Sequence, residues 1–179
     1  MYLLWRKIEK EKKKVIHYIN ANLLNSDCNF ICHQVNCQGK MASGVAGQIR
    51  KRWPEVYTNY KFKCDQAWAI EKEDPMTTKE DYLLGSVQIL YLEDANIPYQ
   101  CVVNMFAQAF YGYDGARYTS YDAFWNCLNE LKNEIPKGAT VAFPYKIGCG
   151  LGGANWEIIE KMIDIVFADY GVFIYKLEE

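Results

Sequence analysis

Short apolar runs alternate with amphipathic segments along most of the chain. The run "VIHYIN" predicts a strand over 15–20. The run "NFICHQV" predicts a second strand over 29–35, and its nearly continuous apolarity indicates burial on both faces. Apolar runs of the same kind predict four further strands, over 84–92, 100–107, 141–145 and 172–176.

Helical patterns lie between these strands. Ser43 is placed to cap a helix with the sequence "GVAGQIRKR", and Pro54 to open the next one, "EVYTNYKFKC". Thr119 or Ser120 caps a helix that ends near Asn133, and a last helix is expected over 155–168, whereas the polar stretch 66–81 predicts a surface loop. The alternation predicts an α/β fold, a three-layer α/β/α sandwich. Its sheet should be mixed, because 84–107 holds two strands with no helix between them.

Composition is that of a soluble globular domain: 50% of the 179 residues are apolar and 23% are charged. No apolar run approaches the roughly 18 residues of a membrane span, and no signal-peptide pattern opens the chain. Seven cysteines, an odd number, lie largely in strand-like runs, which indicates reduced thiols in a cytoplasmic protein. With two histidines and no CxxC pair, neither a metal site nor a cofactor is expected.

Charge divides the chain into a basic N-terminal extension, residues 1–14, and a domain over 15–179. The extension holds six Lys/Arg and two Glu, a net of +4, so a total of −2 leaves −6 for the rest. The basic segment could touch RNA or anionic lipid, join an upstream segment, or be a solvated helix. The acidic domain argues against a DNA or RNA partner, and we expect a monomer.

The stretch "VAFPYKIGCGLGGANWEII" joins a strand to a helix through four glycines in six residues. Without Cβ atoms, successive N–H groups can point at one anion, and the helix adds its positive end. A P-loop is excluded because Ala154 and Asn155 follow the last glycine, and a cysteine-phosphatase loop because position 155 is not Arg. Gly148-x-Gly150-x-x-Gly153 fits the dinucleotide fingerprint by letter, but too little chain follows for the rest of that domain. A tight packing turn remains the alternative on this loop alone.

A second strand–loop–helix unit, "CHQVNCQGKMASGVAGQIRKRWPEVYTNY", supports a ligand site, because two such loops form a crevice at the strand ends. Together with "YINANLL" and "PYKIGCGLGGANWEII", it makes residues 15–178 resemble a macro domain. The resemblance is to the branch of ADP-ribose 1''-phosphate phosphatases and ADP-ribosyl-glutamate hydrolases. It implies a mixed sheet between helices and a cleft for ADP-ribose, its derivatives or an ADP-ribosylated protein.

The resemblance also implies which residues bind. Asn22 and Leu23 would meet adenine, and Tyr175 would stack on it. The second loop would cradle the diphosphate with Ile147, Gly148, Cys149, Gly150, Leu151 and Gly152. The first loop would face it with Ser43, Gly44 and Val45, while Asn36, Gly39 and Met41 would surround the distal ribose and Gln108 would lie at the same end.

For catalysis, the resemblance offers two patterns. The glutamate hydrolases use a strand lysine and an aspartate in the second loop, but "VVNMFAQAF" contains no lysine and Gly152 occupies the aspartate position. The phosphatases carry a histidine at the position of His33. We expect His33, with Asp114, to support slow hydrolysis of ADP-ribose 1''-phosphate or an ADP-ribosyl ester. A core role for His33 remains open. So do a non-catalytic reader of ADP-ribose or an NAD-derived signal, and a dinucleotide-dependent oxidoreductase.

Overall fold

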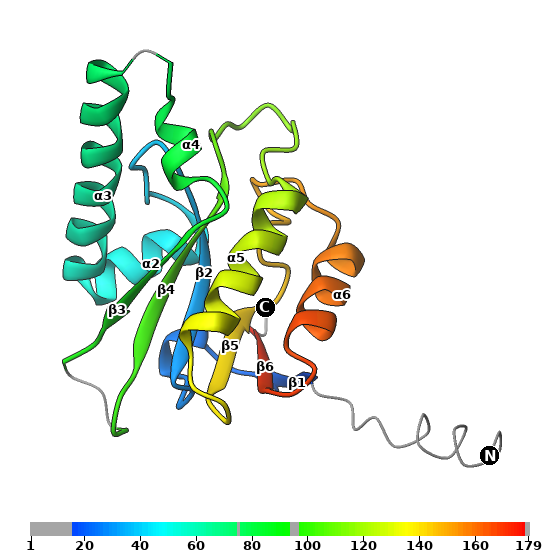
Figure 1. Cartoon of the computed structure of the whole chain (residues 1–179). Helices are drawn as coiled ribbons and strands as arrows, with labels where there is room; N and C mark the ends of the chain where they lie inside the picture. Colours follow the sequence, from blue (N-terminus) through cyan, green and yellow to red (C-terminus); the bar gives the residue numbers. More distant parts are fainter. Residues whose placement is uncertain (1–15, 75, 94–96, 178–179) are drawn as a thin grey trace, which may run out of the picture.

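The computed structural model describes residues 16–74, 76–93 and 97–177, which form one six-stranded sheet between two helical layers (Figure 1). The sheet order is β1-β6-β5-β2-β4-β3. Only β3 runs antiparallel to its neighbour, β4, and the other pairs are parallel. The strands are β1 (Ile16–Asn20), β2 (Phe30–Asn36), β3 (Val87–Tyr91), β4 (Cys101–Gln108), β5 (Thr140–Pro144) and β6 (Gly171–Lys176). The predicted three-layer sandwich with a mixed sheet is therefore confirmed.

Three helices cover one face of the sheet and two cover the other (Figure 1). The first layer holds α2 (Gly44–Arg52), α3 (Pro54–Glu73) and α4 (Lys79–Leu83), and the second holds α5 (Tyr121–Glu134) and α6 (Trp156–Val166). A short 3-10 helix, Leu23–Asn25, follows β1. Fully buried Phe124, Leu128 and Ile163 bring α5 and α6 onto the sheet, while Ile49 and Tyr60 do so for α2 and α3.

The starts of α2, α3, α5 and α6 agree with the sequence prediction, but the surface loop expected over 66–81 is wrong. Helix α3 continues to Glu73, and α4 follows after a short turn. The reason is that Cys64 and Ala67 prolong the buried stripe of α3, so the polar residues lie on its solvent side. Thr78 then caps α4 in a reciprocal capping box with Asp81.

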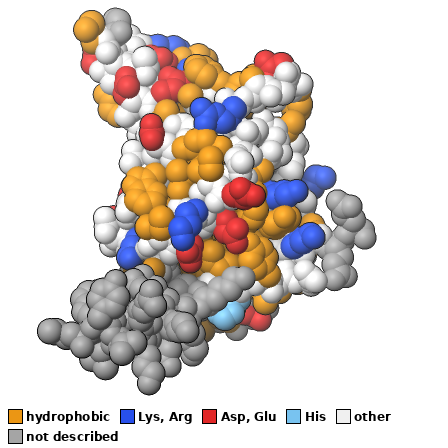
Figure 2. All heavy atoms as spheres, turned by 90° about the vertical axis from the view of Figure 1, so that its right-hand side faces the viewer, with side chains coloured by type: hydrophobic (Ala, Val, Ile, Leu, Met, Phe, Trp, Pro, Cys, Tyr) orange, Lys and Arg blue, Asp and Glu red, His pale blue; other side chains and the backbone are white. Residues whose placement is uncertain are grey.

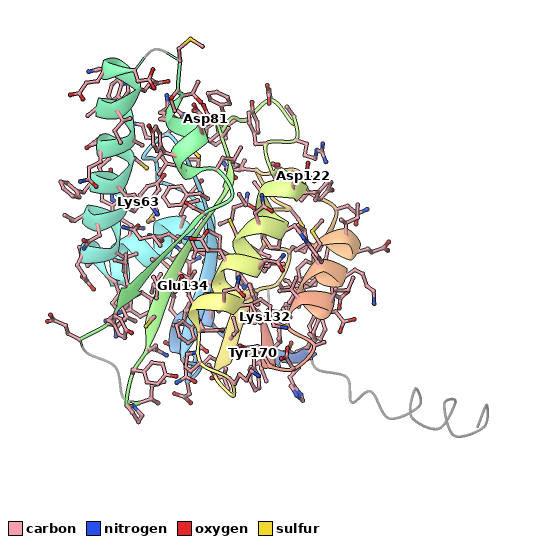
Figure 3. The ribbon with its side chains drawn as sticks, viewed as in Figure 1. Lys63, Asp81, Asp122, Lys132, Glu134 and Tyr170 are labelled. Atoms are coloured by element: carbon pink, nitrogen blue, oxygen red, sulfur yellow. The ribbon has the colours of Figure 1, made fainter. Side chains whose placement is uncertain are left out.

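Polar contacts fasten the second helical layer at the end far from the site. The Lys132 ammonium on α5 donates to the Val166 carbonyl oxygen (2.7 Å) and to Asp169 (2.7 Å), and the Tyr170 hydroxyl donates to the Lys132 carbonyl oxygen (3.4 Å). Figure 3 shows Lys132 and Tyr170 together at this end of the helices. At the opposite end, where the parallel strands finish, loops follow the strands.

Two further expectations concern the N-terminal extension and membrane-spanning helices. The basic extension 1–14 lies outside the described residues. Within the described ranges, none of the helices combines the length and apolarity that crossing a membrane requires.

Candidate functional site: a cleft at the strand ends

Two adjoining cavities of about 700 and 640 Å³ lie where β1, β2, β5 and β6 end. They share Val45, Pro144, Tyr145 and Lys146, so they form one elongated cleft. The first cavity is bounded by the loops after β2, β4 and β5, and the second by the segment after β1 and the end of β6. Such a crevice at the carboxyl ends of parallel strands is where α/β sheets bind ligands.

The N-terminus of α2 opens directly onto the first cavity. Ser43 stands at the N-cap position, yet its side chain makes no capping hydrogen bond and the first turn holds no acidic residue. The first intrahelical bond is from Gly47 N–H to the Ser43 carbonyl oxygen, so the preceding helical N–H groups have no partner within the helix. Ser43, Gly44 and Val45 line the cavity, and their uncapped end is suited to an anion.

The loop after β5 faces α2 across the same cavity. Gly148 and Gly153 adopt positive φ values of 74° and 66°, which favour glycine. Among the described residues, no hydrogen bond is made by the backbone N–H groups of four residues, Gly148, Gly150, Leu151 and Gly152. All four line the cavity, so a second set of unpaired donors confronts the helix end.

A polar cluster holds this glycine loop from below. The Thr119 hydroxyl donates to the Gly148 carbonyl oxygen (2.9 Å), and the Gln34 side-chain amide donates to Thr119 Oγ1 (2.8 Å) and to Gln108 Oε1 (2.6 Å). A Cβ at Gly152 would lie 2.4 Å from both the Gly148 oxygen and Thr119 Oγ1. The loop is therefore closely packed underneath and free only towards the cleft.

The second cavity contains the residues expected at adenine. Asn22, Leu23 and Tyr175 line it together. The Asn22 Oδ1 atom accepts from the Leu24 N–H (2.9 Å), which fixes the side-chain amide at the start of the 3-10 helix. Lys146 lines both cavities and Lys176 lines the second. Their ammonium groups each lie 5.4 Å from the centre of the Tyr145 ring.

His33 lines the first cavity from β2, although only 1% of its surface is exposed. Its Nε2 lies 2.5 Å from Asn104 Oδ1, and its Nδ1 is buried without a partner in the described part of the chain. Burial lowers the pKa of His33 to about 4, against a smaller raising effect of the Asn104 hydrogen bond. The imidazole is consequently neutral near pH 7.

The structure brings most of the predicted site residues to the cleft. Asn22, Leu23, His33, Asn36, Gln108, Ile147 and Tyr175 line it, with the glycines and α2 residues described above. Asn36 also organises the first loop, since its Oδ1 accepts from the Gln38 N–H (2.9 Å) and its Nδ2 donates to the Lys40 carbonyl oxygen (2.7 Å).

Four predicted residues are not among those that line the cleft. Met41 is 1% exposed and packs in the core beside Tyr60, and Gly39 lies under the Lys61 side chain. The Cys149 thiol points back to the Ile147 carbonyl oxygen (3.4 Å), and burial raises its pKa, so the side chain packs inward.

Asp114 is the fourth. Its Oδ1 accepts from the Ala116 N–H (3.0 Å) and the Tyr118 hydroxyl (3.0 Å), and these bonds lower the pKa of the carboxyl. The carboxylate thus makes hydrogen bonds within the loop that contains it.

Several cleft residues were missed by sequence reasoning. Lys40, Tyr111, Tyr113, Tyr145 and Lys146 all line it. The aromatic "FYGYDGARY" segment was visible in the sequence as a signal. The position of Lys146 could not be predicted, because it depends on a backbone φ of 58°, which a non-glycine residue such as lysine rarely adopts. No group of three or more His, Cys, Asp or Glu side chains suited to a metal occurs in the described ranges.

The macro domain model matches residues 32–163. This chain belongs to the macro domain family. An uncharacterized 17.5 kDa protein of Enterobacteria phage T4 is 30% identical over 170 residues, which cover 92% of this chain and 97% of the phage protein. A DNA ADP-ribosyl glycohydrolase of Mycobacterium tuberculosis is 26% identical over 153 residues, which cover 86% of this chain but only 39% of the relative.

Solved structures agree on the fold of this macro domain. A protein of unknown function from Bacteroides thetaiotaomicron is 27% identical, with a TM-score of 0.72 over 90% of this chain and 98% of that one. The macrodomain of Mycobacterium tuberculosis DarG gives a TM-score of 0.68 at 23% identity, over 89% and 96% of the two chains.

Proposed function

We propose that this macro domain binds ADP-ribose along the cleft, with adenine at Tyr175 and the diphosphate between the two loops. The observation that carries the proposal is that two sets of N–H groups without partners in the described residues, at the start of α2 and in the glycine loop, line one cavity. A diphosphate has acceptor oxygens on both sides, so it can take hydrogen bonds from both loops at once. Lys146, which lines both cavities, adds a positive charge to the cleft.

The reaction that fits the site is hydrolysis at the distal ribose, of ADP-ribose 1''-phosphate or of an ADP-ribosyl ester. His33 is a titratable side chain of the first cavity, and its Nδ1 is buried without a partner among the described residues. The lysine–aspartate pair of the glutamate hydrolases has no counterpart. No lysine occurs from 101 to 110, and a side chain at Gly152 would collide with Thr119. We therefore propose a mechanism that forms no lysine adduct.

One of the relatives suggests a further substrate to test. Because one relative is a DNA ADP-ribosyl glycohydrolase, ADP-ribosylated DNA should be tested beside the phosphate and the protein ester. The prediction that nucleic acid is not a partner rests on the acidic balance of residues 15–179. Figure 2 shows acidic, basic and apolar side chains intermixed on the described part of the face around α6.

Calorimetric titration of ADP-ribose into two glycine variants tests the binding mode. In Gly150→Ala the new methyl group meets no protein atom within 4 Å and φ is unstrained, so stability should hold while binding weakens by at least about tenfold. Gly138→Ala is the converse control. Its φ of +85° penalises a side chain, so stability should fall, but it does not line the cleft and affinity should be kept. Undiminished binding by Gly150→Ala would contradict the proposed diphosphate position.

Turnover separates the hydrolase from the non-catalytic reader. Purified protein with ADP-ribose 1''-phosphate should release orthophosphate, and His33→Ala should lose this activity while it still binds ADP-ribose. Equal rates in both proteins would remove His33 from the mechanism. The reader is favoured by the missing lysine and aspartate, and it predicts ADP-ribose binding with no release from any of the three substrates.

A further inference from the structure

A row of three polar side chains crosses the sheet beneath α3. Asn104 on β4 stands opposite His33 on β2 and opposite Gln88 on β3. The ring Nε2 of His33 lies 2.5 Å from Asn104 Oδ1, and Asn104 Nδ2 donates to Gln88 Oε1 at 3.0 Å. Gln88 Nε2 then donates to the backbone carbonyl oxygen of Asn59 in α3 at 3.2 Å. This row separates the apolar cluster around Ile49 from the one around Tyr60.

The direction of every bond in this row follows from its last member. The Asn59 carbonyl oxygen can only accept, so Gln88 must turn its NH₂ group towards it and its Oε1 towards Asn104. Asn104 must then present its NH₂ group to Gln88 and its Oδ1 to His33. Because that oxygen also only accepts, the proton of the neutral imidazole belongs on Nε2. The Nδ1 atom is left with an unprotonated lone pair.

This lone pair is one of two buried acceptors in the first cavity that have no partner in the described residues, and the other is Gln34 Oε1. Nδ1 is buried and has no partner in the described ranges, and leaving a buried acceptor unpaired is unfavourable. The ring lines the cavity that also contains Asn36 and the start of α2. A hydroxyl group or water in that cavity would supply the missing donor. Burial and the Asn104 hydrogen bond shift the pKa of the imidazole, and no charged side chain of the described residues contributes to that shift.

We propose that Asn104 and Gln88 are positioning residues that hold His33 as its Nε2–H tautomer, so that Nδ1 accepts a hydrogen bond, and then a proton, from a water or hydroxyl group in the cleft. This inference rests on the proposed function and deepens it. With ADP-ribose 1''-phosphate, the water oxygen forms a bond to phosphorus and its proton passes to Nδ1. The bond between phosphorus and the ribose oxygen breaks, that oxygen keeps the electron pair, and it takes the proton from Nδ1. The products are ADP-ribose and orthophosphate.

Nitrogen-15 NMR of histidine-labelled protein tests the tautomer without any ligand. The chain has only two histidines, so His33→Gln assigns the signals. We expect a protonated Nε2 and an unprotonated Nδ1 for His33 at pH 7. Addition of ADP-ribose should then shift the Nδ1 signal. A protonated Nδ1 in the free protein overturns the inference, and so does an Nδ1 signal that stays unmoved when calorimetry shows ADP-ribose bound.

Variants of Gln88 test whether the row acts through His33. Gln88→Met removes the group that orients Asn104, so both tautomers should appear and kcat should fall about tenfold with little change in KM. Gln88→Glu keeps an oxygen for Asn104 Nδ2 and should retain the single tautomer and most of the rate. If both variants keep the wild-type tautomer, the proposed positioning role is wrong.

Asn104→Asp supplies an independent readout. A carboxylate beside Nε2–H favours the imidazolium, so the acidic limb of the pH–rate profile should move upward from about pH 4. An unmoved limb in a folded variant excludes His33 as the proton acceptor. Failure of ADP-ribose to bind wild-type protein would instead refute the proposed function, while the tautomer measured in free protein still decides the inference about Asn104 and Gln88.

Discussion

His33 and Gln34 are neighbours on β2, yet they serve opposite faces of the sheet in different ways. His33 lies on the sheet face covered by α2 and α3, at the end of a row of hydrogen-bonded side-chain amides, and its Nδ1 has no partner among the described residues. Gln34 faces the other layer, where it joins Gln108 and Thr119 beneath the glycine loop. Both arrangements leave a buried acceptor without a partner in the described residues, His33 Nδ1 in the first and Gln34 Oε1 in the second. Only the second also holds the backbone of the glycine loop, through Thr119. Strand β2 thus supplies a candidate catalytic side chain, His33, and a side chain that supports the proposed binding loop, Gln34.

Gly152→Ala should show the largest effect, on the Gln34 side. The new Cβ would lie 2.4 Å from the Gly148 oxygen and Thr119 Oγ1, so the loop must move. We expect a loss of about 3 kcal/mol in the free energy of unfolding, measured in urea, together with loss of ADP-ribose binding. Gly150→Ala is the matched control and should keep wild-type stability. Equal stabilities would show that the loop is not held as described.

On the His33 side, stability should depend on pH below the ordinary pKa of histidine. The folded pKa is lowered from 6.5 to about 4, so between these values the unfolded chain binds more protons. Stability is therefore complete above about pH 6.5 and falls as the pH drops towards 4, by up to about 3 kcal/mol. Urea unfolding across this window should show a smaller pH dependence in His33→Gln. Parallel pH profiles would mean that the ring is not buried as a neutral group.

Thr119→Val should have a moderate effect. It preserves shape but removes the hydroxyl that donates to the Gly148 oxygen and accepts from Gln34. A loss of about 2 kcal/mol is expected, with weaker ADP-ribose binding because the loop is less fixed. Thr58→Val, at an exposed site on α3, is the control and should change stability by less than about 0.5 kcal/mol. If the two variants are indistinguishable, the hydroxyl does not support the loop.

Asp114→Asn should have the smallest effect. The exposed carboxylate accepts two bonds from its own loop, and an amide oxygen can accept both. Orthophosphate release should stay within about twofold of wild type. A loss comparable with that of His33→Ala would restore Asp114 as a catalytic residue.

Much of the fold could be read from the sequence because apolar runs and helix caps carry local information. Ser120 caps α5 and Pro54 opens α3 as expected. The error over 66–81 arose because the solvent-facing side of a long helix and a loop have similar polar compositions. Only tertiary burial of Cys64 and Ala67 distinguishes them.

The sequence predicted the parts of the site that are formed by backbone better than the parts that depend on side-chain orientation. Two glycine-bearing loops at strand ends predict a shared cleft from topology alone, and the structure places both loops on it. The orientation of His33 could not be predicted, since it depends on register across three strands that are distant in sequence. The inward packing of Met41 and the self-contained loop of Asp114 likewise depend on tertiary contacts.

The central claim is that one diphosphate bridges the start of α2 and the glycine loop. Backbone amide NMR during an ADP-ribose titration tests it most directly. We predict that the amide signals of Gly44 and Val45 shift together with those of Gly148, Gly150 and Gly152, with one common dissociation constant. Shifts confined to one loop, or shifts that saturate at different ADP-ribose concentrations in the two loops, would contradict the claim.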